Sequence, residues 1–281
     1  MKPVRVFFVM TALTLLLSIV TGAVPYGVAM EQSDVYYKGV SGMGETWEES
    51  RSISYTSYTK QTVQTSSRIP SLSNVNPNYQ SNDCAPIAGG NIIAFYDILY
   101  SNLIPDYRTG RIINNNYIFN TVTTNQYLQK VIDDLYVIMK TNQITAGTRE
   151  QDFLDGLTQY VEQAGLHFQT TGGLVSNNSV NVQSLISHLN TKNIAVLFMT
   201  EYNIISVIED TGNQLKFTAV CSNTPHIVAV YGVEQYTIIQ NGVETTEYFL
   251  KIANNMEEFN YGLIRLNDYL NITDFLKINI S

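Results

Sequence analysis

Three side chains of this sequence, Cys84, His226 and Asn254, are of the types that together perform nucleophilic chemistry. A thiol attacks a carbonyl carbon when a neighbouring base removes its proton, and a third group orients that base. The order Cys, His, Asn is used by thiol enzymes in which about 130–150 residues separate the first two. We therefore predict that Cys84 is the nucleophile, His226 the base and Asn254 the orienting group.

The residues around Cys84 predict that it opens a helix. Asp83 is a good N-cap, Pro86 suits the first turn, and an apolar helix-period stretch runs to about Ser101. Unpaired N–H groups and the positive end of the helix dipole favour a thiolate at this position. The same N–H groups offer a donor for an oxyanion. Gly89 and Gly90 in this helix predict a close neighbour there.

Each of these residues also has a structural alternative. Cys84 is either a nucleophile, a helix-start cysteine without a special role, or half of a disulfide with Cys221, which would silence the site. His226 is either a base or a satisfied histidine at the start of a strand. Asn254 is either an orienting group or an ordinary strand terminator, and Asn255 is the alternative candidate for the role.

The rest of the chain supplies the elements that would position these groups. Helices are predicted over 126–140, 150–164 and 180–189, and again over 268–276. Strands are predicted over 194–199, 203–208, 214–220, 227–233, 236–239, 246–252 and 261–266, with hairpin turns at 211–213 and at Asn241-Gly242. Because helices precede the antiparallel strands, the predicted class is α+β.

The N-terminus predicts export. Lys2 and Arg5 precede an apolar run over 6–20, and cleavage is expected after Ala23 or Ala29. Residues 1–30 are therefore read as a signal peptide, 31–75 as a linker, accessory or pro-segment, and 76–281 as the main domain. We expect a secreted or extracellular protein, free or attached to the cell surface. A formal net charge of −8, without a cluster of basic residues, argues against nucleic acid and anionic membranes as partners.

Three segments resemble the C39-like family of bacterial papain-superfamily cysteine peptidases. Residues 78–91 (NYQSNDCAPIAGGN) resemble its nucleophile segment, 225–232 (PHIVAVYG) its histidine strand and 249–255 (FLKIANN) its Asp/Asn strand. The resemblance implies a papain-like fold, in which an N-terminal helical part with the nucleophile helix packs on a C-terminal antiparallel sheet. It also implies an oxyanion-hole side chain shortly before the cysteine, either Gln80 or Asn78.

The resemblance further implies thiol-dependent cleavage of peptide bonds through an acyl-enzyme, without a metal or organic cofactor, on a peptide or protein substrate. The alternative is a surface binding protein with the same fold and a degenerate triad, which the 19 tyrosines and many asparagines would suit. The sequence does not fix the oligomeric state.

Overall fold

Most of the protein is built from β-strands. The computed structural model describes residues 23–25, 36–37, 46–78, 82–120, 124–176, 179–256, 259–268 and 270–281. The helices are α1 (Cys84–Tyr96), α2 (Gln126–Ile138), α3 (Glu150–Gln163) and α4 (Val182–Asn190). The long strands are β3 (Thr46–Ser54), β4 (Ser57–Gln64), β11 (Ala195–Asp210), β12 (Gln214–Ser222), β13 (His226–Gln240), β14 (Val243–Met256), β15 (Phe259–Arg265) and β16 (Asn271–Ile280). The short strands are β1 (Ala23–Pro25), β2 (Tyr36–Tyr37), β5 (Gly110–Ile113), β6 (Asn116–Phe119), β7 (Thr148–Arg149), β8 (Phe168–Thr171), β9 (Val175–Ser176) and β10 (Ser179–Asn181).

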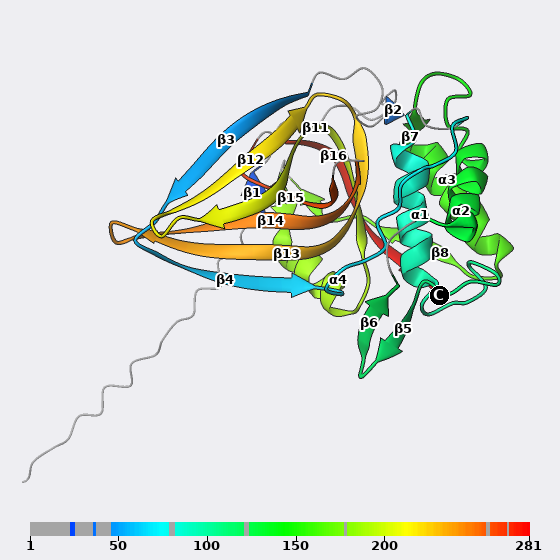
Figure 1. Cartoon of the computed structure of the whole chain (residues 1–281), viewed down its shortest axis with the longest axis horizontal. Coiled ribbons are helices and arrows are strands. Elements are labelled where there is room, and N and C mark those ends of the chain that lie inside the picture. The colour runs from blue at the N-terminus through cyan, green and yellow to red at the C-terminus, as the bar shows by residue number, and fades with distance from the viewer. Residues whose placement is uncertain are drawn as a thin grey trace, which may run out of the picture.

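A nine-stranded antiparallel sheet forms the body of the molecule. Its main path runs β3-β12-β11-β15-β14-β13-β4, and β16 and β8 extend it from β11. The two ends of this path are consecutive in the chain, because β3 and β4 are joined at Tyr55 and Thr56. The Tyr55 N–H donates to Asn213 (3.0 Å) and the Thr56 N–H to Ile239 (2.7 Å), which ties three hairpin tips together. The sheet is therefore strongly curled (Figure 1).

The expected α+β, papain-like arrangement is wrong. The structure is mostly β, and two long sheet strands, β3 and β4, precede the first helix. Residues 46–64 lack an apolar pattern, but their backbone completes both ends of the curled sheet by pairing with β12 and β13. The expected terminal helix over 268–276 is also wrong. Residues 271–280 form β16, whose backbone pairs with β11. This pairing places the apolar side chains of β16 in the core.

Most of the remaining local predictions are confirmed. The three expected internal helices correspond to α2, α3 and α4, and β13 begins at His226. Both hairpin turns are present, and Asn241 and Gly242 each have a positive φ (52° and 79°), as a tight turn between twisted strands requires. The strands differ from expectation in length, since four predicted segments merge into β11 and β13.

Helix α1 is the buried centre of the helical layer. All of its residues are buried, and it lies between α2 and α3 on one side and β13 and β14 on the other (Figure 1). The close neighbour predicted at the two glycines is confirmed. A Cβ on Gly89 would meet Met139 Cε at 2.8 Å and Leu135 Cδ1 at 3.1 Å. This close fit lets α1 pack tightly against α2 and α3.

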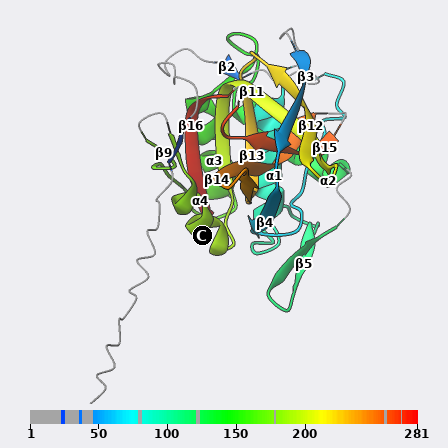
Figure 2. The same cartoon turned by 90° about the vertical axis from the view of Figure 1, so that its left-hand side faces the viewer.

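The opposite face of the sheet is covered separately. Helix α4 packs there with apolar residues of β11, β13, β14 and β16, and the short strands β9 and β10 lie alongside (Figure 2). A third apolar cluster fills the inside of the curl and includes Phe217, Tyr236 and Phe249.

The predicted boundaries at 30 and 75 stay predictions. Residues 1–22 and 26–35 lie outside the described part, while Ala23–Pro25 pairs with β10. Strands β3 and β4 belong to the same sheet as the strand that begins at His226. Among the described residues, no helix combines the length and the hydropathy needed to span a membrane.

Candidate functional site

Cys84 is the first residue of α1, as predicted, but it is buried. Only 2% of its surface is exposed. Asp83 does not cap the helix with its side chain; its carboxylate instead accepts a hydrogen bond from Asn74 Nδ2 at 2.9 Å. Burial raises the pKa of the Cys84 thiol well above its usual range, and a backbone hydrogen bond from Ile227 opposes this only in part. The thiol is therefore neutral in this conformation and lies beside the second residue of β13.

His226 is the first residue of β13 and pairs with Met199 of β11. Only 1% of its surface is exposed. Burial lowers the pKa of the imidazole to about 4, because the charged ring loses its hydration, and the neighbouring Asn254 side chain partly opposes this. Neither ring nitrogen makes a hydrogen bond of ordinary geometry to a described residue. The imidazole is thus neutral at pH 7.

Asn254 lies near the end of β14, close enough to His226 to raise the pKa of its ring. It is 1% exposed, and its backbone carbonyl accepts a hydrogen bond from Ser71 Oγ at 3.1 Å. The structure therefore brings the orienting candidate to the base, as the sequence predicts. The side chain of Asn255 lies outside what the structure describes, so the choice between the two asparagines stays a prediction.

Tyr202 of β11 joins the thiol and the imidazole at one place. Its ring lies 5.2 Å from the His226 ring, centroid to centroid, with 38° between the planes. The Cys84 thiol lies near enough to contribute to the raised pKa of the Tyr202 phenol, after burial. The tyrosine is completely buried. Sequence reasoning missed it, because it falls between two predicted strands, belongs to no motif and has polar sequence neighbours in Thr200, Glu201 and Asn203.

The two oxyanion candidates have different outcomes. Gln80 lies outside the described residues. Asn78 is exposed, and its backbone N–H donates to Asn76 Oδ1 at 3.1 Å. The backbone N–H groups of Cys84 and Ala85, at the first turn of α1, lie against the thiol and oppose part of the rise in its pKa.

Cys221 is separate from this site. Both cysteines are buried and neither forms a disulfide, so the structure does not contain the alternative Cys84–Cys221 bridge. Cys221 lies on β12, paired with Trp47 of β3, inside the curl of the sheet. Burial raises the pKa of its thiol to about 11, and the acidic Glu49 and Asp268 add to the rise. A neutral, enclosed thiol of this kind is a packing residue.

The acidic residues beside Cys221 belong to a polar cluster that the sequence did not reveal. Asp268, whose side chain is 4% exposed, pairs with Arg51 at 2.9 Å and lies 3.9 Å from Arg265. Arg265 pairs with Glu247 at 3.0 Å, and its backbone N–H donates to Asn203 Oδ1 at 3.0 Å.

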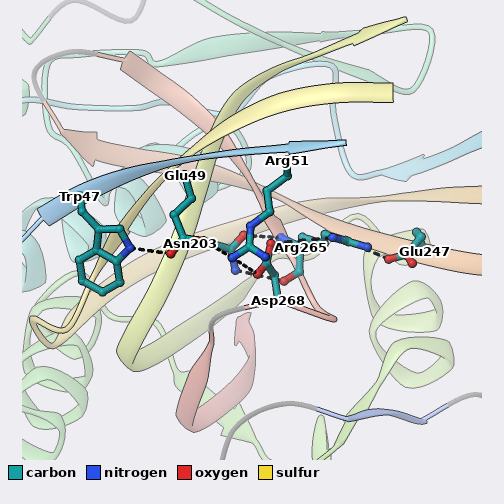
Figure 3. A network of polar contacts seen from close by, with 7 residues as sticks. All are labelled: Trp47, Glu49, Arg51, Asn203, Glu247, Arg265 and Asp268. Carbon is teal, nitrogen blue, oxygen red and sulfur yellow. Dashed lines mark hydrogen bonds and ion pairs between the residues drawn. The ribbon is translucent and has the colours of Figure 1, made fainter. Parts of the chain in front are cut away.

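Figure 3 shows these side chains pointing toward one another from β3, β11, β14, β15 and the loop that follows β15. Trp47 extends the cluster along β3, because its indole N–H donates to Glu49 at 2.7 Å. The cluster ties the first strand of the sheet path to three others. The charged residues of the cluster occupy inward positions of β3, where apolar residues would have predicted a strand.

The described residues hold no group of three or more His, Cys, Asp or Glu side chains arranged to bind a metal ion. No protein-family model matches the chain, and no curated protein matches it significantly.

Proposed function

We propose that the protein is an exported thiol-dependent hydrolase that cleaves peptide bonds through Cys84, His226 and Asn254. The proposal is supported by one geometric observation. Ile227, whose backbone hydrogen-bonds the thiol, directly follows His226. Tyr202 contacts the imidazole, and the nearby thiol contributes to the raised pKa of its phenol. The three motifs that resemble C39-like peptidases add support from the sequence alone.

The charge states favour general-base catalysis over a preformed ion pair. A raised thiol pKa and an imidazole pKa near 4 leave both groups neutral at pH 7. A neutral imidazole is the form that accepts a proton. The thiol proton would pass to His226 as sulfur bonds to the carbonyl carbon. The resulting oxyanion would accept a hydrogen bond from the Cys84 backbone N–H and a second one from the side chain of Gln80 or Asn78.

Collapse of this intermediate would break the carbon–nitrogen bond. The proton held by His226 would go to the leaving amine, and the acyl group would remain on sulfur as a thioester. Water, deprotonated by His226, would then hydrolyse the thioester and restore the thiol. Asn254 would keep the imidazole aimed at these atoms throughout. Both Cys84 and His226 are buried, so a substrate reaches them only if their covering residues move apart.

The test is hydrolysis of a fluorescence-quenched peptide library by four purified proteins. We expect Cys84→Ala to fall to background, and His226→Ala to lose about 10²–10⁴ in kcat/KM. The matched control is Cys221→Ala, which removes the other buried thiol and should keep full activity. Full activity in Cys84→Ala would end the proposal.

A binding protein without catalysis is the second candidate, and the burial of the site favours it. An enclosed, neutral cysteine and histidine also fit a degenerate triad that only packs the core. An epoxide-type thiol inhibitor separates the two functions. Stoichiometric labelling of Cys84 that depends on His226 supports the hydrolase. Absence of labelling at any inhibitor concentration supports the binding protein.

A further inference from the structure

Tyr202 contacts the imidazole of His226 without any assigned task. Its ring is held by strand pairing on β11, where Tyr202 is opposite Ser222 of β12. The two rings are 5.2 Å apart and tilted by 38°, a distance at which ring faces and edges are in contact. Both residues are buried, so the tyrosine ring occupies space beside the imidazole that water would otherwise fill.

We propose that Tyr202 is a positioning residue for His226: its ring covers the imidazole, excludes water from it and fixes the direction in which its nitrogens point. The bearing of this contact on catalysis rests on the hydrolase function proposed above. The contact itself and its effect on the imidazole are independent of that function.

The contact with Tyr202 acts together with the nearby Asn254 side chain in restraining His226. Its nitrogens make no hydrogen bond of ordinary geometry to a described residue. Backbone pairing with Met199 fixes the main chain but leaves χ1 and χ2 free. Packing against Tyr202 and the proximity of Asn254 restrict both angles.

The electrostatic surroundings agree with this role. Tyr202 of β11 and the uncharged Asn254 of β14 lie beside the imidazole, while Cys84, with Asp83 before it, lies against the next residue of β13, Ile227. The low pKa of the imidazole comes from burial, and no charged side chain of the described residues shifts it. Groups that exclude water therefore control the charge of the base, and Tyr202 is a large side chain in contact with it.

The hydroxyl of Tyr202 has a smaller part. Burial raises the pKa of the phenol far above neutrality, and Ser222 opposes this only in part, so the phenol is uncharged at pH 7. An uncharged phenol adds little to the field at the imidazole. The inference is therefore specific to the aromatic ring, which separates Tyr202→Phe from Tyr202→Leu.

The experiment is a proton NMR titration of the histidines in the full chain. The chain has only three histidines, His167, His188 and His226, so each signal is assigned by its loss in a single His→Asn variant. We expect the pKa of His226 to be unchanged in Tyr202→Phe and to rise to about 5 or higher in Tyr202→Leu, because water enters a polar cavity. The ring-current shift of the His226 signal should persist in the first variant and disappear in the second.

Tyr231→Leu is the matched control. Tyr231 is a buried tyrosine on the same strand as His226, but its ring packs on Tyr261 at 6.1 Å. It should leave the His226 titration unchanged at equal loss of stability. If Tyr202→Leu does not fold, Tyr202→Met replaces it, since methionine fills most of the volume without an aromatic ring.

The outcomes separate this inference from the proposed function. The inference is overturned if the His226 titration and ring-current shift are identical in the natural protein, Tyr202→Phe and Tyr202→Leu. This holds whether or not the protein hydrolyses peptides. If the leucine variant shifts the titration but no protein cleaves peptides, the inference stands and the hydrolase function fails. If both hold, the acid limb of kcat/KM should move to higher pH in Tyr202→Leu and stay in place in Tyr202→Phe.

Discussion

The buried neutral imidazole of His226 makes a quantitative prediction about stability and pH. In the unfolded chain a histidine titrates near pH 6.5, whereas burial lowers the pKa in the folded protein to about 4. Between these values the unfolded state binds a proton that the folded state does not. Stability therefore rises with pH across this window, and acidification through it favours unfolding.

The size of the effect follows from the width of the window. A pKa difference of one between the folded and unfolded states corresponds to about 1.4 kcal/mol. The difference between about 6.5 and about 4 therefore changes the free energy of unfolding by about 3 kcal/mol. The side chain is 1% exposed, so solvent screening does not reduce this value. Its stabilising contribution is complete above pH 6.5 and is lost as the pH falls to about 4.

The assay is urea unfolding of the natural protein and of His226→Asn from pH 7.5 to pH 4. The difference between the two curves removes titrations common to both proteins. His188 contributes in the same direction, because burial lowers its pKa although its Nε2 lies 2.8 Å from the Ile194 carbonyl oxygen. His188→Asn is measured in parallel, so that the two contributions are obtained separately.

The opposite slope would refute the reasoning. A thiolate–imidazolium pair would raise the pKa of His226 above its unfolded value, and its stabilisation would be present at low pH and lost as the pH rises. Relative to His226→Asn, the natural protein would then gain stability on acidification below pH 7.5. A flat difference would also contradict the structure, since it requires a hydrated imidazole.

Three further predictions concern the framework around the site. Asp268→Asn should destabilise the fold by about 1–3 kcal/mol in chemical unfolding, because it removes the carboxylate that Arg51 and Arg265 share and leaves them only Glu49 and Glu247; Asp210→Asn, on an exposed carboxylate, should change stability much less. Gly156→Ala should cost about 1–3 kcal/mol in the same assay, since its Cβ would lie 2.5 Å from Met139 Cγ, whereas Gly172→Ala, whose Cβ has its nearest contact at 4.0 Å, should be nearly neutral. Thiol titration without reductant should count two free thiols in the unfolded protein and show slow reaction of both in the native state; an absence of thiols after unfolding would contradict the free, buried cysteines.

Local sequence determined the elements that need only near neighbours. Asn241-Gly242 specifies a tight hairpin because both residues adopt positive φ readily, and β13 and β14 meet at that turn. The start of α1 at Cys84 follows from Pro86 in the first turn and the apolar run behind it. The periodic helices α2, α3 and α4 were equally readable, since each shows one apolar face.

Tertiary structure decided the fold class and the state of the site. Strand β3 places Glu49 and Arg51 on its inward face, where an ion-pair cluster with distant residues replaces the apolar pattern that announces a strand. Residues 271–280 became a strand because β11 offered a partner edge. The sequence predicted three chemical groups in order, but whether they are hydrated depends on what surrounds them. Tyr202, for example, contacts His226 only after the sheet has folded, because burial is a property of the assembled chain and not of any segment.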